Sequence, residues 1–444
     1  NTVTKMKVLK FGGTSVGSAQ RMKEVAKLIT DGEQKIVVLS AMSGTTNTLV
    51  EISDYLYKKN PEGANEIINK LEAKYKQHID ELFATQEYKQ KGLEVVKSHF
   101  DYIRSYTKDL FTLFEEKVVL AQGELISTAM VNFYLQECGV KSVLLPALEF
   151  MRTDKNAEPD PVYIKDKLRA QLDLYPDTEI YITQGFICRN AYGEIDNLQR
   201  GGSDYTASLI GAAINASEIQ IWTDIDGMHN NDPRIVDKTA PVRQLHFEEA
   251  AELAYFGAKI LHPTCIQPAK YANIPVRLLN TMDPEAPGTL ISNDTEKGKI
   301  KAVAAKDNIT AIKIKSSRML LAHGFLRKVF EIFESYQTSI DMICTSEVGV
   351  SVTVDNTKHL NEILDDLKKY GTVTVDKEMC IICVVGDLEW ENVGFEAKAL
   401  DAMRDIPVRM ISFGGSNYNI SFLIRECDKK VALQSLSDML FNGK

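Results

Sequence analysis

The sequence contains no uninterrupted apolar run near the ~18 residues that a membrane-spanning helix needs, and residues 1–7 lack the apolar core of a signal peptide. It also lacks an excess of positive charge, because 52 Lys and Arg against 61 Asp and Glu give a net charge of −9. We therefore expect neither a membrane nor a nucleic-acid partner. Any anion site must be a local positive pocket in an acidic protein.

Metal-binding and disulfide patterns are equally scarce. Seven cysteines, an odd number scattered over the chain, favour reduced thiols and a cytoplasmic protein. Cys380 and Cys383 lie three apart in an apolar run that predicts a strand, where such positions face opposite sides, which disfavours a shared metal or a disulfide. The seven histidines have no ligand spacing, so we expect no metal ion held by protein side chains alone.

A chain of 444 residues exceeds what one core usually supports, so we expect two or three domains. Over residues 1–283, short apolar runs alternate with helical patterns, which predicts an α/β domain with a mostly parallel sheet sandwiched by helices. The predicted strands are 36–40, 142–146, 179–184, 219–223 and 274–279, and the predicted helices are 18–30, 45–58, 118–137, 162–172, 205–215 and 247–258. Residues 61–116, rich in Lys, Glu and Tyr, predict a helical insertion that is either a lid or a structural subdomain.

The chain changes character after the α/β domain. Residues 284–307 combine prolines and glycines with polar side chains, which predicts a linker. Beyond the linker, a shift of about 68 residues superposes similar apolar patterns, so we predict two ferredoxin-like α+β units at 308–376 and 377–444. Two such units indicate a regulated enzyme, although a duplication can also serve stability alone.

The segment from Lys10 to Gly17 is the most informative motif. A predicted strand runs into Gly12 and Gly13 and then into a helix, which places bare backbone N–H groups and one lysine where an anion can bind. Gly12 and Gly17 match the glycines of a Walker A loop, but Ser18-Ala19 follow where Lys-Ser/Thr is required. The dinucleotide fingerprint G-x-G-x-x-G is also absent from this segment. The alternative is an ordinary strand-to-helix turn.

Two further segments bring hydroxyl groups and charge to the same domain. Ser40 to Thr46 follow the second predicted strand and open a helix, and they either bind a ligand or only cap the helix. Glu124 stands among apolar residues of a predicted helix, where burying an unpaired charge is costly. Its partner is either a substrate ammonium or a cation of the protein.

The turn Arg200-Gly201-Gly202-Ser203-Asp204 carries both signs of charge, which suits a zwitterionic ligand or an internal ion pair. Thr223-Asp224 and Asp232-Pro233-Arg234 follow a strand that ends in Trp222, and they suit a nucleotide or a solvated turn. Lys259 lies in an apolar segment, where it either contacts phosphate or reaches solvent. No Ser-His-Asp arrangement is evident, and the inventory favours phosphoryl transfer.

Five motifs in order carry a family resemblance. K-F-G-G-T-S at 10–15, R-G-G-S-D at 200–204, T-D at 223–224, D-P-R at 232–234 and F-G-A-K-I-L-H-P at 256–263 resemble those of aspartate kinases, members of the amino acid kinase superfamily. The tail resembles that family's paired ACT regulatory domains. The resemblance implies the amino acid kinase fold and ATP-dependent phosphorylation of the β-carboxylate of L-aspartate to 4-phospho-L-aspartate. That reaction is the first step of lysine, threonine and methionine biosynthesis.

The resemblance also implies a role for each matching position. Lys10 and Asp204 are the expected catalytic residues. The expected substrate-binding residues are Ser40, Thr46, Glu124, Arg200, Gly201, Gly202 and Ser203. The expected ATP-binding residues are Lys10, Gly12, Gly13, Thr223, Asp224, His229, Arg234, Lys259 and Ile260, with Mg²⁺ held mainly by phosphate oxygens. Gln199 and His229 depart from the common family residues, Gly and Tyr, and the second departure leaves the contact to the base open.

The first ACT unit resembles the effector site of lysine-inhibited members. The implied allosteric residues are Met319, Gly324, Phe325, Leu326, Ser339, Ile340, Asp341, Thr345, Ser346 and Glu347. Asp341 and Glu347 suit the ammonium groups of a basic effector, whereas Leu321 and Ala322 replace polar residues of enterobacterial lysine-sensitive enzymes. Lysine is therefore the expected effector, with threonine as the alternative, and pairing of ACT units implies a homodimer.

Two other functions compete with this interpretation. The same fold can phosphorylate another acceptor, such as glutamate. Alternatively, the chain is a catalytically silent amino-acid sensor that uses only its ACT units. Retention of the four charged residues Lys10, Arg200, Asp204 and Lys259 argues against a silent protein.

Overall fold

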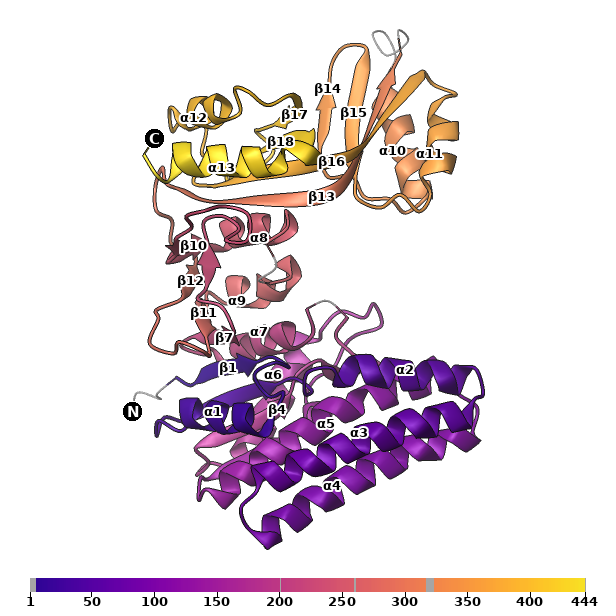
Figure 1. The fold of residues 1–444 in the computed structure, drawn as a ribbon, viewed down its shortest axis with the longest axis vertical. Helices are drawn as coiled ribbons and strands as arrows, with labels where there is room; N and C mark the ends of the chain where they lie inside the picture. Colours follow the sequence, from indigo (N-terminus) through magenta and orange to yellow (C-terminus); the bar gives the residue numbers. More distant parts are fainter. Residues whose placement is uncertain (1–4, 200, 259–260, 317–322, 444) are drawn as a thin grey trace. The chain divides into compact units, whose positions relative to one another are not determined.

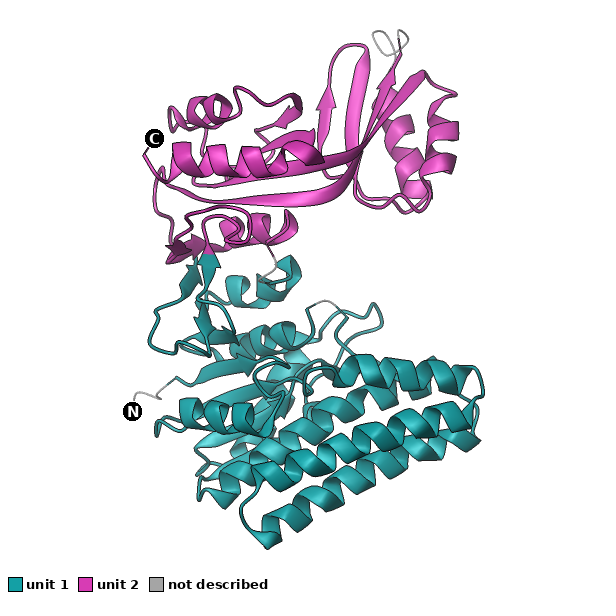
Figure 2. Ribbon diagram, in the orientation of Figure 1, with its two compact units in different colours: residues 1–228, 261–293 teal, residues 229–260, 294–444 magenta. Residues whose placement is uncertain are grey.

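The computed structural model describes residues 5–199, 201–258, 261–316 and 323–443 (Figure 1). The chain forms two compact units (Figure 2): unit 1 comprises residues 1–228 and 261–293, and unit 2 comprises residues 229–260 and 294–444. The sequence predicted instead a single boundary near residue 283.

Unit 1 contains most of the predicted α/β elements. Its strands are β1 (Lys7–Phe11), β2 (Lys35–Leu39), β3 (Ser142–Leu145), β4 (Ile180–Gln184), β5 (Ile187–Arg189), β6 (Ile195–Asn197), β7 (Ile219–Thr223), β11 (Val276–Asn280) and β12 (Thr289–Ser292). Its helices are α1 (Ala19–Ile29), α2 (Thr45–Tyr57), α3 (Pro61–Leu82), α4 (Gln86–Ser105), α5 (Leu113–Glu137), α6 (Pro161–Asp173), α7 (Gly202–Ile214) and α9 (Gln267–Tyr271).

The main sheet of unit 1 is mostly parallel, as predicted. Its strands follow the order β12-β11-β7-β1-β2-β4-β3. Strand β1 pairs in parallel with both β2 and β7, and only β12 runs antiparallel to its neighbour β11. Every residue of β2 and of β4 is buried, which explains why these strands are mainly apolar, with Lys35, Thr183 and Gln184 as the exceptions. The carboxyl ends of β1, β2 and β7 therefore meet at one edge of the sheet.

The predicted insertion is helical and belongs to the core of unit 1. Helices α3 and α4 lie beside α2 and α5 (Figure 1). The rings of Tyr75 and Phe100 pack edge to face at 5.6 Å, and both side chains share one apolar cluster with Phe11 of β1. Among the described helices, α5 is long and apolar enough to cross a membrane, but 78% of its most apolar window is buried inside the protein, as in a core helix.

The remaining elements belong wholly or mainly to unit 2. The strands are β8 (Met228–His229), β9 (Pro241–Val242), β10 (Gln244–His246), β13 (Ile300–Lys315), β14 (Ile343–Thr345), β15 (Gly349–Val354), β16 (Thr372–Gly386), β17 (Val408–Ser412) and β18 (Asn419–Arg425). The helices are α8 (Phe247–Tyr255), α10 (Phe325–Ser335), α11 (Leu360–Leu367), α12 (Phe395–Ala402) and α13 (Lys429–Leu440).

The internal repeat appears as two α+β halves that share one sheet, in the order β14-β15-β13-β16-β18-β17. Strands β13 and β16 run through both halves. The second half of β13 pairs with β15, whereas its first half pairs only with the end of β16, from Ile381 to Gly386. The predicted linker 284–307 is therefore corrected, since it includes β12 and the start of β13. Apolar residues such as Ala302 and Ala304 are buried there, and the prolines and glycines that suggested a linker end at Gly298.

The segment 229–260 packs against the second repeat, which is why it belongs to unit 2. Val236 is buried in the same apolar cluster as Phe395 and Leu433. The amide of Asn231 donates a hydrogen bond to the backbone oxygen of Leu433 at 3.0 Å. No pattern in the sequence indicates these long-range contacts, so a boundary at one chain position could not describe them.

Candidate active site

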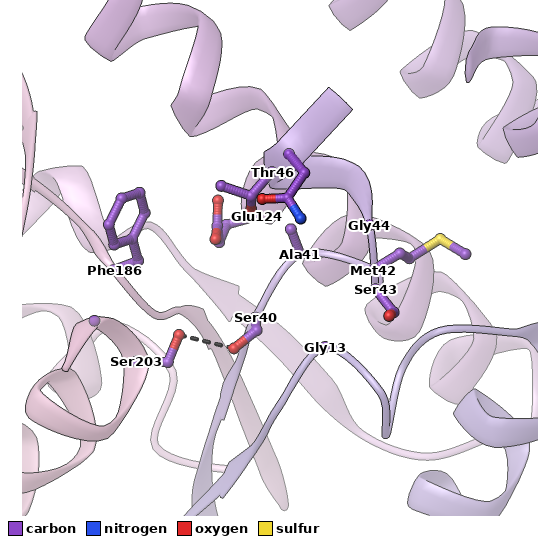
Figure 3. Close-up of a pocket in the computed structure, with 12 residues that line it drawn as sticks. Gly13, Ser40, Ala41, Met42, Ser43, Gly44, Thr46, Glu124, Phe186 and Ser203 are labelled. Atoms are coloured by element: carbon purple, nitrogen blue, oxygen red, sulfur yellow. Dashed lines mark hydrogen bonds between the residues drawn. The ribbon is translucent and has the colours of Figure 1, made fainter. Parts of the chain in front are cut away.

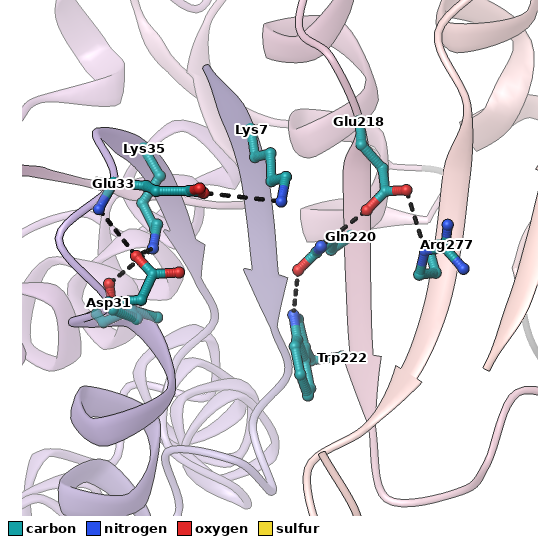
Figure 4. A network of polar contacts seen from close by, with 9 residues as sticks. Lys7, Asp31, Glu33, Lys35, Glu218, Gln220, Trp222 and Arg277 are labelled. Atoms are coloured by element: carbon teal, nitrogen blue, oxygen red, sulfur yellow. Dashed lines mark hydrogen bonds and ion pairs between the residues drawn. The ribbon is translucent and has the colours of Figure 1, made fainter. Parts of the chain in front are cut away.

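The carboxyl end of β1 is held by aromatic packing and by polar contacts on the neighbouring strands. Phe11 stacks on Trp222 with the ring centroids 5.7 Å apart. The indole N–H of Trp222 donates to Gln220 at 3.1 Å, and Gln220 donates in turn to Glu218 (Figure 4). Glu218 also accepts a 3.0 Å hydrogen bond from Arg277 of β11. This network joins β7 to β11, and the stacking of Phe11 on Trp222 connects it to the end of β1.

Lys10 and Asp204 form an ion pair beside the glycine loop. The ammonium nitrogen of Lys10 lies 2.9 Å from Oδ1 of Asp204, and the two side chains are only 13% and 17% exposed. A Cβ added to Gly12 would lie 3.3 Å from the Lys10 nitrogen, so a side chain there would crowd the ammonium. Both residues predicted as catalytic are thus adjacent.

The turn that carries Asp204 depends on glycine. Gly201 and Gly202 have φ angles of +73° and +44°, which L side chains rarely adopt. A Cβ on Gly201 would lie 1.7 Å from Sγ of Cys265, so no other residue fits against the buried cysteine. Helix α7 begins at Gly202, three residues before the predicted start, and Asp204 stands in its first turn. Arg200 lies outside the described residues.

A pocket of about 270 Å³ opens at the carboxyl edge of the sheet (Figure 3). It is lined by Gly13, Ser40, Ala41, Met42, Ser43, Gly44, Thr46, Asn47, Glu124, Phe186, Gly202 and Ser203. The hydroxyl of Ser40 donates to that of Ser203 at 2.8 Å, joining two motifs 163 residues apart. The structure therefore gathers five of the predicted substrate-binding residues, together with Gly13, around one pocket.

Phe186 is the lining residue that the sequence did not suggest. It follows β4 and has a φ of +72°, which is strained for an aromatic residue. Its backbone N–H donates to the hydroxyl of Thr206 at 3.0 Å, which fixes this conformation. Periodicity identifies the strand before Phe186 but carries no sign of the strained turn.

Glu124 on α5 faces the pocket from the opposite side to Ser203 (Figure 3). Its side chain is buried, and Oε2 has no hydrogen-bond partner. Burial raises the pKa of Glu124 to about 8, although hydrogen bonds from the backbone N–H groups of Glu124 and Ala41 oppose this shift. Within the described part of the chain, no cation lies within ion-pair distance of Glu124, which disfavours the internal salt bridge. The carboxylate is placed for a cation that enters from outside.

The predicted nucleotide residues are divided between the units. In unit 1, Thr223 is the last residue of β7, which lies next to β1 in the sheet, and Asp224 follows it. In unit 2, a ring nitrogen of His229 contacts the hydroxyl of Thr239 at 2.8 Å, and the exposed Arg234 makes two hydrogen bonds to Asp232. Lys259 and Ile260 lie outside the described residues.

The predicted effector residues also fall into two sets. Gly324, with a φ of +82°, precedes α10, and Phe325 and Leu326 begin that helix. Thr345 ends β14, and Ser346 and Glu347 belong to the turn between β14 and β15. Ser339, Ile340 and Asp341 precede β14, and the backbone N–H of Asp341 donates to Thr353, close to the other end of β15. A single chain thus separates Asp341 from Glu347 by the length of β14, and Met319 lies outside the described residues.

Asp341 already has partners in unit 2. Its Oδ1 accepts a 2.8 Å hydrogen bond from the hydroxyl of Tyr255 on α8 and lies 3.3 Å from the ammonium of Lys306. Lys306 also pairs with Asp355 at 3.0 Å. Burial raises the pKa of Asp341, while Tyr255 and Lys306 oppose that shift.

Comparison with known proteins places this geometry in a class. Residues 5–280 match the model of the amino acid kinase family, and residues 382–440 match an ACT domain model. The parallel sheet, the glycine loop and the pocket at its carboxyl edge are thus those of an amino acid kinase.

More specific relatives cover almost the whole chain. The chain is 36% identical to aspartokinase 1, chloroplastic, of Arabidopsis thaliana, over 98% of this chain and 80% of the relative. It is 32% identical to the lysine-sensitive aspartokinase 3 of Escherichia coli, over 98% of this chain and 99% of the relative. The crystal structure of E. coli aspartokinase III with aspartate and ADP has a TM-score of 0.82 at 32% identity, over 98% of this chain and 100% of that chain. The complex with lysine and aspartate has a TM-score of 0.81, over 98% and 99%. The chain belongs to the aspartokinase family.

Proposed function

We propose that this protein transfers the terminal phosphoryl group of ATP to the β-carboxylate of L-aspartate, forming 4-phospho-L-aspartate. The observation that carries the proposal is the pocket, which is lined by the buried Glu124, whose Oε2 has no hydrogen-bond partner, and by Ser40 and Ser203. Glu124 can accept the substrate ammonium, and Arg200 on the neighbouring turn can bind a substrate carboxylate. The attacking carboxylate is ionised at neutral pH, so the reaction needs no general base.

Lys10 supplies the positive charge that the transferring phosphoryl group requires. It stands where β1 meets the glycine loop, and Asp204 holds its ammonium from the other side. Charge neutralisation and positioning are the main sources of catalysis in phosphoryl transfer. Gly12 and Gly13 offer backbone N–H groups to the phosphates.

ATP is the phosphoryl donor in this proposal. Thr223, Asp224, His229, Arg234, Lys259 and Ile260 are the residues that we assign to nucleotide binding. Among the described residues, no group of three or more His, Cys, Asp or Glu side chains could hold a metal ion. We therefore assign the Mg²⁺ ion mainly to the phosphates of ATP. There it would reduce the negative charge that Lys10 must balance.

The experiment that tests the reaction is trapping of the acyl phosphate with hydroxylamine in the presence of ATP and Mg²⁺. Aspartate is expected to give the hydroxamate, whereas glutamate and acetylglutamate are expected to give none. A signal with glutamate and none with aspartate would contradict the proposed substrate. No signal with any acceptor would instead support a silent sensor.

For regulation, we propose lysine as the feedback effector at the first ACT unit, with threonine as the second candidate. The support is the lysine-bound state of the E. coli relative and the acidic residues Asp341 and Glu347 in this chain. Lysine is expected to inhibit, and Glu347→Ala is expected to weaken that inhibition. An unchanged inhibition curve in Glu347→Ala would contradict the assignment of Glu347.

We also propose a cytoplasmic homodimer that pairs through its ACT units. Since one chain separates Asp341 from Glu347, a second copy could bring the two sets of effector residues together. Light scattering is expected to give twice the chain mass of 49.7 kDa. Seven free cysteines, five of them buried or half-buried, fit a reducing compartment.

A further inference from the structure

The helical insertion reaches the wall of the substrate pocket through one side chain. Tyr75, in the middle of α3, is fully buried, and its hydroxyl shares a 2.5 Å hydrogen bond with the hydroxyl of Thr45. Its ring packs against Phe100 of α4. The hydroxyl of Tyr75 therefore joins the middle of α3 to the start of α2.

Thr45 is the first residue of α2, the helix whose beginning lines the pocket. Its neighbours Gly44, Thr46 and Asn47 are all lining residues. The helix has Gly44 at its N-cap, and no side chain caps its first N–H groups. The position of this helix end depends on other contacts, and the Tyr75 hydroxyl is one of them.

The same threonine also touches the helix that carries Glu124. A Cβ added to Gly123 would lie 2.8 Å from Cβ of Ala41 and 3.3 Å from the methyl carbon of Thr45. Thr45 is thus held between Tyr75 on one side and the Gly123 turn of α5 on the other. A shift of Thr45 would move both Thr46 and the wall beside Glu124.

The loop before Thr45 joins this contact to the glycine loop. The backbone N–H of Thr45 donates to Met42 at 3.0 Å, and that of Ser43 donates to Gly13 at 3.0 Å. A continuous set of short contacts therefore runs from the insertion to the residues at the end of β1.

We propose that Tyr75 is a positioning residue for the amino-acid substrate, and that the insertion is a fixed wall of its pocket and not a lid. The inference rests on the proposed function, because it assigns the pocket to the acceptor. Tyr75 touches no lining residue through its hydroxyl except by way of Thr45, so it acts on the substrate through α2. Its route to Gly13, which we assign to the ATP phosphates, runs through two further backbone hydrogen bonds, so we expect a smaller effect on ATP than on the acceptor.

The test compares Tyr75→Phe, which keeps the ring, with Thr45→Val, which keeps the shape of the side chain. Each is expected to raise KM for aspartate by about three- to tenfold, the equivalent of one hydrogen bond. KM for ATP and kcat should change by less than about twofold. The double variant should raise KM for aspartate no more than the more strongly affected single variant does, since both substitutions remove the same hydrogen bond.

Tyr106→Phe is the matched control in the same insertion. It removes a hydroxyl that donates a hydrogen bond to the exposed Tyr102, at 3.1 Å, and should leave all constants unchanged. The proposal is overturned if neither Tyr75→Phe nor Thr45→Val changes KM for aspartate, or if both Michaelis constants rise equally. Calorimetric titration compares the affinity of the same variants for aspartate without turnover. A failure of the proposed reaction therefore remains distinguishable from a failure of this inference.

Discussion

At the residue scale, the chemistry of the site comes from a few side chains kept from water. Lys10 and Asp204 are mostly buried and face each other, and one carboxylate oxygen of the buried Glu124, Oε2, has no hydrogen-bond partner. Such groups are costly to a fold, since a buried charge loses its hydration. Their presence around one pocket is the physical signature of a site that a charged ligand completes.

Lys10→Ala is expected to lower kcat by at least ~100-fold, because the transferring phosphoryl group loses its positioned cation. Asp204→Ala should have a similar effect, because it frees the ammonium of Lys10. Lys7→Ala is the control, since Lys7 lies on the same strand but pairs only with the exposed Glu33 at 3.7 Å. Steady-state kinetics would measure kcat of each variant, and circular dichroism would check that it folds. Normal turnover in Lys10→Ala would show that the site is misplaced.

Glu124 makes aspartate binding depend on pH. Its pKa is raised to about 8 in the empty pocket, so the carboxyl is mainly neutral below that pH. An ammonium group binds the ionised form, so KM for aspartate should fall with rising pH, by up to about tenfold per unit between about pH 6 and pH 8. In Glu124→Gln this dependence should disappear, and a wild-type KM that is flat over the range would contradict the assignment.

Ionisation of Glu124 with rising pH favours aspartate binding, but it lowers the stability of the fold. Its pKa in the folded state lies above that in the unfolded chain, so the folded state binds the extra proton and loses stability as pH rises between the two values. Glu124→Gln should therefore melt at a higher temperature than the wild type near about pH 8, with a smaller difference near about pH 5. Thermal melts at the two pH values would test this, and an equal difference at both would contradict a buried titrating carboxyl.

At the element scale, strand β13 of unit 2 joins the two repeats and carries Lys306, which pairs with the proposed effector residue Asp341. Strand β13 begins in the second repeat and ends in the first, and Lys306 lies near the middle of it. There Lys306 contacts both Asp341 and Asp355, and its ammonium stands 4.6 Å from the centre of the Tyr255 ring. A cationic effector that binds Asp341 must compete with this internal cation.

Lys306→Met is therefore expected to lower the lysine concentration that half-inhibits the enzyme by several-fold, because Asp341 loses its internal cation. Lys313→Met is the control, as Lys313 is exposed on the same strand. Titration of activity with lysine measures the effect. An identical curve for wild type and Lys306→Met would show that the effector does not use Asp341.

At the scale of the whole molecule, the catalytic and regulatory parts are not separate pieces of chain. Residues 229–260 belong to unit 2, although the chain then returns to unit 1. This segment contains His229 and Arg234, which we assign to ATP, and Val236, which is buried against the second repeat. The regulatory fold therefore supports a segment that the proposed reaction requires.

A chain that ends at residue 293 is accordingly expected to lose kinase activity and to be poorly soluble. It would expose Val236 and remove the partner of Asn231, so the segment 229–260 would have no core to join. Soluble expression and the hydroxamate assay measure the outcome. A soluble and fully active fragment would show that unit 2 is dispensable for catalysis.

The sequence by itself determined the elements and the motifs. Mainly apolar runs predicted β2, β4 and β7 within one or two residues, because strands buried on both faces carry mostly apolar side chains. The glycine motifs located the turns at Gly12 and Gly201, because only glycine permits such close approach or a positive φ. A charged residue among apolar ones likewise indicated Glu124, and a glycine turn with both signs of charge indicated Asp204, before any contact was known.

Only the tertiary structure decided which distant segments meet. The strained turn at Phe186, the hydrogen bond from Tyr75 to Thr45 and the pairing of β13 with β16 all join residues far apart in the chain. Local periodicity predicts whether a side chain is buried, but it does not predict which residues that side chain packs against. That choice depends on packing the whole core at once, and so the wall of the pocket and the partition into two units could be known only from the fold.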